Sequence, residues 1–185
     1  NLGIDPPADP QPSLILGSID LSPLEVAQLY QSLASGGQVV PISSVREVLD
    51  GQGKALTRFP RPAGNPSGAD VVKLVTVALN ETTLSGTASS LSGGSGIRLD
   101  SAGKTGTSDE SRDSWYAGYT GEHLAVVWLG RDDNQPTRLT GASGALKVWT
   151  ALFRQLPSAD LRLEFSDAIR WLPFDTGDGC QRIRF

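Results

Sequence analysis

Apolar residues recur at helical spacing in three segments of the chain. The first segment opens with Ser22-Pro23-Leu24-Glu25, in which a capping serine precedes a proline at the first helical position and a glutamate follows three residues after the cap. Gly36 and Gly37 end this run. The same period appears at about 69–80 and at about 142–156, so three helices are predicted. The residues expected to face the core are Val26, Leu29, Tyr30 and Leu33 in the first helix, Val71, Leu74, Val75, Ala78 and Leu79 in the second, and Ala145, Trp149, Leu152, Phe153 and Leu156 in the third.

Short apolar runs between these segments predict β-strands. Val39–Val40 and Val45–Leu49 are two short candidates within 38–56, and Asp50–Gly53 supplies a turn. Three longer strands are predicted at 97–108, 114–119 and 124–130, the last two joined tightly enough for an antiparallel hairpin. Helices on a small antiparallel sheet make the predicted fold class α+β.

The remaining segments are predicted to be irregular. Residues 1–12 are proline-rich and extended, and 58–68 reads as a loop because of its proline and glycine content. Twelve of the fifteen residues in 82–96 are Ser, Thr or Gly, which predicts a mobile surface segment. The tail, 158–185, mixes short apolar pieces with a turn at 175–179.

Composition narrows the class of protein. With 185 residues, 38% of them hydrophobic, the chain is long enough for one domain with a core. The net charge of −4 and the absence of a Lys/Arg cluster disfavour binding to nucleic acid or to an anionic membrane surface. Cys180 is the one cysteine, so neither an intrachain disulfide nor a cysteine metal cluster is expected. His123 is the one histidine, and an exposed hairpin position suits it better than catalysis.

The stretch SAGKTGTS, residues 101–108, is open to two chemical interpretations. A phosphate-binding loop needs a glycine five residues before its Gly-Lys pair and a helix directly after it. Position 98 is Arg98, the nearest glycine is Gly96, and a polar run, 108–111, follows the motif. The nucleotide-binding interpretation is therefore disfavoured.

The second interpretation is the wall of a serine acyl-transfer site. The Lys104 ammonium would stabilise negative charge and assist proton transfer, and Gly106 would let a substrate backbone approach the strand. The Thr107 backbone N–H suits an oxyanion, and the hydroxyls of Thr105 and Thr107 suit a carboxylate. Ser108 completes the predicted substrate-binding run, and an edge strand here would pair with an extended peptide.

The surrounding motifs carry a family resemblance. KTGTS is followed by DSWYAGY at 113–119, VWLGRDDNQPT at 127–137 and GASGA at 141–145, and it is preceded by LSPLEVAQLYQSLASGG at 21–37. Together they resemble the C-terminal half of the transpeptidase domain of class A penicillin-binding proteins, most closely the 1b type. The resemblance implies the C-terminal portion of the penicillin-binding/serine β-lactamase-like fold in 1–157, followed by a C-terminal extension in 158–185. Trp115 and Arg131 match family positions and are expected to be scaffold.

The resemblance also implies an activity. A family member lies on the periplasmic side of the bacterial inner membrane, held by a transmembrane helix, and cross-links peptidoglycan stem peptides. Its serine attacks a D-Ala-D-Ala peptide, releases the terminal D-Ala and passes the acyl group to an amine, and β-lactams acylate the same serine. The expected partners are thus stem peptides, β-lactams and the N-terminal part of the same protein, which is expected to carry a glycosyltransferase as well. No cofactor or metal is implied.

Two of the three family motifs are missing from the chain. A Ser-x-x-Lys pair needs a serine three residues before a lysine, and among Lys54, Lys73, Lys104 and Lys147 only Lys104 has one, at Ser101. On a strand these two side chains point to opposite faces and cannot cooperate. No asparagine has a serine two places before it, because those places before Asn65, Asn80 and Asn134 hold Ala63, Ala78 and Asp132, and the segment 132–134 is expected to be a turn.

The nucleophile is therefore expected outside this chain, which we expect to be the C-terminal piece of a larger protein and inactive alone. One alternative of a different class is a non-catalytic module that keeps the same surface for binding a peptide or a partner. Another is a penicilloyl serine hydrolase or β-lactam sensor, against which the tail and the GRDDNQPT segment at 130–137 argue.

Overall fold

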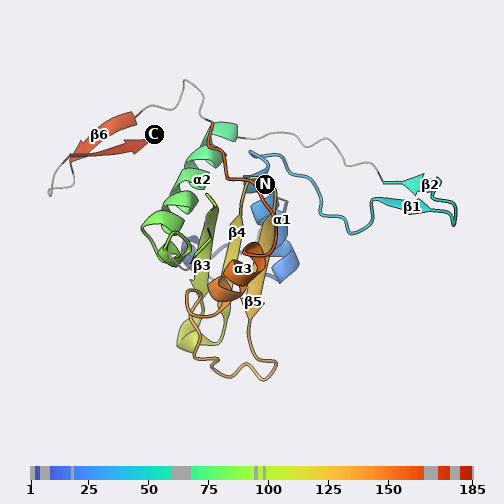
Figure 1. Ribbon diagram of the computed structural model, residues 1–185. Helices are drawn as coiled ribbons and strands as arrows, with labels where there is room; N and C mark the ends of the chain where they lie inside the picture. The colour runs from blue at the N-terminus through green and yellow to red at the C-terminus, as the bar shows by residue number, and fades with distance from the viewer. Residues whose placement is uncertain are drawn as a thin grey trace.

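Three helices and a three-stranded sheet form the centre of the molecule, as a computed structural model shows (Figure 1). The structure describes residues 3–4, 9–17, 19–59, 68–93, 96–97, 99–164, 171–175 and 180–184. The elements are α1 (Pro23–Ala34), β1 (Glu47–Leu49), β2 (Ala55–Arg58), α2 (Ala69–Leu84), β3 (Ala102–Thr107), β4 (Ser114–Tyr119), β5 (Leu124–Leu129), α3 (Ala145–Phe153), β6 (Trp171–Asp175) and β7 (Cys180–Arg184), with short 3-10 turns η1 (Pro12–Leu16), η2 (Ser89–Leu91) and η3 (Asp109–Ser111).

The central sheet has the strand order β3-β4-β5, and both pairings are antiparallel. Lys104 lies opposite Ala117 and Gly106 lies opposite Trp115. The three predicted strands and the β4–β5 hairpin are confirmed, although β3 begins at Ala102 rather than at 97. The predicted α+β class is confirmed.

The two faces of the sheet bury separate cores because side chains alternate along each strand. Tyr116 and Trp149 lie in the core on the α3 face, together with Ala88 and Leu91. On the opposite face, Tyr119 and Ala102 pack with residues of α1 and α2 such as Leu33 and Val72. Helices thus cover both sides of the sheet.

The first helix follows its sequence signals. The Ser22 hydroxyl accepts a hydrogen bond from the Glu25 backbone N–H at 3.3 Å, and a Glu25 carboxylate oxygen accepts one from the Ser22 N–H at 2.7 Å. This reciprocal capping box lowers the pKa of Glu25, chiefly through the Ser22 hydroxyl. The predicted start of α1 is confirmed.

The second helix is longer than predicted, and its predicted core face is only partly right, because Leu79 packs against the core but Val71 and Val75 do not. Val71 is 64% exposed and Val75 is 39% exposed, whereas the buried residues are Val72, Thr76 and Thr83. The Thr76 hydroxyl lies 2.9 Å from the Tyr119 hydroxyl, which puts this face against the sheet. The face of α2 that packs on the sheet therefore includes threonines with hydrogen-bond partners, and hydrophobic spacing cannot predict such a face.

The segment after α2 was predicted to be a mobile surface segment; most of 82–93 is exposed as predicted, but part of it is anchored in the core. Residues 82–84 continue the helix, and η2 follows it. Ala88 and Leu91 are fully buried, at 0% and 2% exposure. Two apolar side chains among many serines and glycines thus anchor the segment in the core.

The strand prediction for 38–56 is only partly right. The hairpin consists of β1 and β2 around the predicted turn, so Ala55–Arg58 takes the place that was predicted for Val39–Val40. Its apolar residues stay exposed, with Leu56 at 64%, and an Arg58–Glu47 ion pair of 3.1 Å crosses the strands. Most of the predicted 58–68 loop lies outside the described residues, as does 176–179 of the predicted turn in the tail.

Two predictions, one in the third helix and one at the end of the sheet, are wrong. Leu152 of α3 is 46% exposed, and Leu146 lies in the core in its place. His123 is half-buried rather than exposed, with its Nδ1 3.0 Å from the Ser158 hydroxyl. The Leu161 N–H donates to the Asp100 carbonyl at 2.9 Å, so the start of the predicted extension is bonded to the segment just before β3.

Candidate functional site

The strand that carries the KTGT motif lies at an edge of the sheet. In the part of the chain that the structure describes, β3 pairs with β4 alone, so its other side has no strand beside it. In an antiparallel pair, alternate residues direct their backbone N–H and C=O groups toward the partner strand and away from it. The identity of the outward-facing residues therefore decides what this edge can bind.

Side chains at the end of α2 bind the first part of the edge. The Asn80 amide and the Thr83 hydroxyl both donate to the Ser101 carbonyl, at 2.8 and 3.0 Å. The Thr82 hydroxyl donates to the Gly103 carbonyl. The carbonyls of residues 101 and 103 thus face away from β4, and by alternation the backbone groups of Thr105 and Thr107 do so too.

Lys104 lies where the edge becomes open. Its side chain is exposed, and its Nζ donates to the Thr105 carbonyl at 2.9 Å. Ser101, the sole serine with the right spacing to a lysine, is only 1% exposed. The two side chains therefore lie in different environments, which supports the prediction that they do not act together.

The two threonines of the motif lie on the same face of β3, and each contacts a different neighbour. Thr107 Oγ1 accepts a hydrogen bond from the Gly141 N–H at 2.9 Å. Thr105 Oγ1 lies 2.7 Å from Thr87 Oγ1. Gly106 is close to its cross-strand neighbour, because a Cβ there would lie 3.1 Å from the Trp115 Cβ. Two hydroxyls thus lie on one face of the strand, and the Lys104 ammonium lies at the strand edge, on the Thr105 carbonyl.

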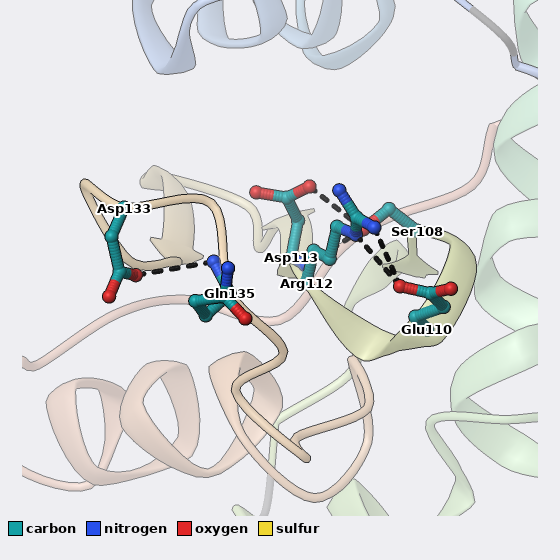
Figure 2. A network of polar contacts seen from close by, with 6 residues as sticks. All are labelled: Ser108, Glu110, Arg112, Asp113, Asp133 and Gln135. Carbon is teal, nitrogen blue, oxygen red and sulfur yellow. Dashed lines mark hydrogen bonds and ion pairs between the residues drawn. The ribbon is translucent and has the colours of Figure 1, made fainter.

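Ser108 closes the base of the loop between β3 and β4. Its hydroxyl donates to an Asp113 carboxylate oxygen at 2.8 Å and accepts from the Asp113 N–H at 2.8 Å, and both residues appear in Figure 2. The other Asp113 oxygen accepts from the Trp128 Nε1–H at 2.9 Å. These bonds hold the end of the motif strand in place.

A second loop, 131–137, follows β5 and contacts the first loop, between β3 and β4. The Thr137 N–H and hydroxyl both donate to the Ser111 carbonyl, at 2.9 and 2.7 Å. Within this second loop the Arg131–Asp133 ion pair of 2.6 Å lowers the pKa of Asp133 to about 2, and the Gln135 N–H also donates to Asp133 (Figure 2). This contact agrees with a scaffold role for Arg131.

The expected turn at 132–134 is confirmed by the Asn134 N–H, which donates to the Arg131 carbonyl at 3.0 Å.

Two residues of the first loop, Glu110 and Ser111, have positive φ angles of 57° and 55°. Such strain in non-glycine residues persists only where surrounding contacts hold it, as Thr137 does here.

Comparison with known proteins decides the family. Residues 8–156 match the model of the penicillin binding protein transpeptidase domain. The chain belongs to this family.

Two relatives are similar over most of this chain, and one solved structure shares its fold. The chain is 40% identical to penicillin-binding protein 1B of Vibrio cholerae over 89% of this chain and 21% of that protein. It is 36% identical to penicillin-binding protein 1B of Escherichia coli over 91% of this chain and 22% of that protein. Its fold matches the crystal structure of penicillin-binding protein 1A from Haemophilus influenzae with a TM-score of 0.81 and 21% identity, over 94% of this chain and 33% of that one. The chain thus spans about a fifth of the length of these 1B relatives.

The described part of this transpeptidase-family chain contains no group of three or more His, Cys, Asp or Glu residues placed to hold a metal ion. None of its described helices is long and apolar enough to cross a membrane.

One residue beside the motif was missed by sequence reasoning. Thr87 belongs to the Ser/Thr/Gly-rich segment that was predicted to be mobile, and its residue type resembles that of its neighbours. The only sequence signal was Gly86 before it and the small apolar Ala88 after it, which together suit a tight, anchored turn.

Proposed function

We propose that β3 forms one wall of the acyl-transfer site of a peptidoglycan D,D-transpeptidase. The observation that carries the proposal is the division of the β3 edge. Side chains of α2 occupy the carbonyls of Ser101 and Gly103, whereas the next outward carbonyl, that of Thr105, accepts from the exposed Lys104 ammonium, beside two threonine hydroxyls. Membership of the transpeptidase family and the name of the 1B relatives, penicillin-binding protein, support this function.

Each group on the open edge has a role that suits its chemistry. The Lys104 ammonium stabilises developing negative charge and assists proton transfer at the nucleophile. The Thr107 N–H, which by alternation points away from β4, donates to the oxyanion of the tetrahedral intermediate. The hydroxyls of Thr105 and Thr107 bind a carboxylate, either the terminal one of a stem peptide or that of a β-lactam.

The outward backbone groups of Thr105 and Thr107 support peptide binding by strand addition. An extended D-Ala-D-Ala peptide would add to the free side of β3 and use these groups as hydrogen-bond partners, with Lys104 Nζ releasing the Thr105 carbonyl. Gly106 would leave the strand surface open between them, and Ser108, whose hydroxyl binds Asp113, would act by fixing the end of the run.

The proposal extends to the full-length protein. Its nucleophilic serine lies outside this chain, forms an acyl-enzyme with release of the terminal D-Ala, and is acylated by β-lactams. We further propose that 1–157 completes the transpeptidase domain and 158–185 is an extension. The full-length protein would also carry a glycosyltransferase and lie on the periplasmic side of the inner membrane, held by a helix outside this chain.

The test is acylation of the full-length protein by a fluorescent penicillin. Removing one oxyanion or carboxylate donor costs about a hundredfold in rate, so Lys104→Ala and Thr107→Val should each reduce acylation by roughly that factor. Thr57→Val is the matched control, because Thr57 is exposed on β2, away from the central sheet. Unchanged acylation in both site variants would place the acyl-transfer site elsewhere and favour a non-catalytic binding module.

A further inference from the structure

The hydroxyl of Thr87 lies 2.7 Å from Thr105 Oγ1, beside the open part of the β3 edge. We propose that Thr87 is a positioning residue for carboxylate binding: it donates its proton to Thr105 and thereby holds the Thr105 proton toward the ligand. The inference rests on the proposed function, since it assigns the state of one of the two hydroxyls that bind the carboxylate.

Thr87 is held between two fixed residues. A Cβ at position 86 would lie 2.8 Å from the Thr82 Cα, so only glycine allows this close return of the chain to the end of α2. The Ala88 N–H donates to the Thr82 carbonyl at 3.0 Å, and the Ala88 side chain is fully buried. Thr87 itself is exposed. A rigid turn therefore presents an exposed hydroxyl to the motif strand.

The neighbouring threonine shows what this contact achieves. Thr107 Oγ1 accepts from the Gly141 N–H, a group that can only donate, so the Thr107 proton stays available for a ligand. Between Thr87 and Thr105 either hydroxyl can be the donor. When Thr87 donates, Thr105 reaches the same state as Thr107, with its acceptor site filled by the protein and its proton free.

Two such hydroxyls suit a carboxylate. Thr105 and Thr107 are two residues apart on one strand, so their side chains lie on the same face. A carboxylate offers two acceptor oxygens and no proton, so it selects the arrangement in which both threonines donate. A hydrogen bond from Thr87 also polarises the Thr105 hydroxyl, which strengthens the bond that Thr105 donates. The nearby Lys104 ammonium favours the same charged ligand.

The test is a double-mutant cycle on the full-length protein, with the second-order rate of acylation by a carboxylate-bearing penicillin as readout. Thr87→Val should lower this rate about threefold to tenfold, the effect of one lost hydrogen bond in a network. Thr87→Ser, which keeps the hydroxyl, should retain the rate. In a Thr105→Val background, Thr87→Val should have no further effect, because the bond it supports is already absent. Thr57→Val is again the control.

The outcomes separate this inference from the proposed function. If Thr105→Val and Thr107→Val slow acylation but Thr87→Val does not, the inference is overturned and the proposed function stands. If Thr87→Val slows acylation equally with and without Thr105, its role is merely structural and the inference is again overturned. If Lys104→Ala, Thr105→Val and Thr107→Val all leave acylation unchanged, the proposed function itself fails. The thermal midpoint of each variant shows whether it is folded.

Discussion

The glycine that precedes the motif lysine gives the sharpest prediction for stability. Gly103 lies on β3 opposite Gly118, and the ring of Tyr116 fills the space beside both glycines. A Cβ at Gly103 would lie 2.7 Å from the Ala117 carbonyl oxygen, and it would also overlap the Tyr116 hydroxyl. Carbon and oxygen atoms normally approach to about 3.3 Å, so Gly103→Ala requires a backbone shift of roughly half an ångström.

The cost follows from which atom must move. The Tyr116 hydroxyl is the end of a side chain, but the Ala117 carbonyl belongs to β4 and is fixed by the sheet. Overpacking costs about 1–3 kcal/mol, and a clash with backbone belongs at the upper end, about 3 kcal/mol. For a domain of this size that lowers the unfolding midpoint by about 6–12 °C. The displaced strand carries Lys104, so acylation should fall as well.

The assay is thermal unfolding of the full-length protein, followed through the transition that bound penicillin raises. Gly93→Ala is the matched control, because a Cβ at Gly93 would lie an ordinary 3.7 Å from the Ser90 carbonyl oxygen. Adding Tyr116→Phe to Gly103→Ala should recover only part of the loss. Equal midpoints for Gly103→Ala and Gly93→Ala would refute the steric reasoning.

Three further changes test other parts of the structure. The Tyr116 hydroxyl is buried without a hydrogen-bond partner among the described residues, and burial raises its pKa. Tyr116→Phe alone should therefore stabilise the protein by about 1 kcal/mol. A lower thermal midpoint would show that the hydroxyl has a partner after all. Ser22→Ala removes the capping box of α1 and should lower the free energy of unfolding, measured by chemical denaturation, by about 1 kcal/mol. Hydrogen exchange should become faster in that helix alone, and unchanged exchange would contradict the role of the cap. The Arg131 guanidinium lowers the pKa of Asp133 from 3.8 to about 2, so its stabilisation of the 131–137 loop should be complete above pH 3.8 and lost as pH falls toward 2. Carboxyl titration by NMR measures this shift, and Arg131→Ala should return the Asp133 pKa toward its ordinary value.

Local signals in the sequence determined the start of α1, the three strands of the sheet and the position of the motif on a strand. A capping serine, a proline and a glutamate act within one helical turn, and strand alternation acts within a few residues, so no distant partner is needed to recognise them. Strand alternation also predicted the separation of Ser101 from Lys104, and in the structure Ser101 lies buried just before β3 whereas Lys104 is exposed.

Only the tertiary structure decided how α2 is turned and what the segment after it does. Hydrophobic spacing predicted that Val71 and Val75 face the core, yet both are exposed. The helix is oriented by Asn80, Thr82 and Thr83, whose side chains bond to outward carbonyls of the strand and its start. Those carbonyls come from residues about twenty positions further along the chain, so their need for donors exists only once the sheet has formed.

The site itself divides in the same way. The residue types of Lys104, Thr105 and Thr107 were readable from sequence, because an ammonium and two hydroxyls on an edge strand suit an anionic substrate. Their partners were not, because Thr87 and Gly141 reach the strand from turns that separate parts of the chain supply. The sequence determined which groups of the strand could bind a ligand. The packing of distant turns decided which hydroxyl protons are free, because a hydroxyl's donor state depends on the neighbour that occupies its acceptor site.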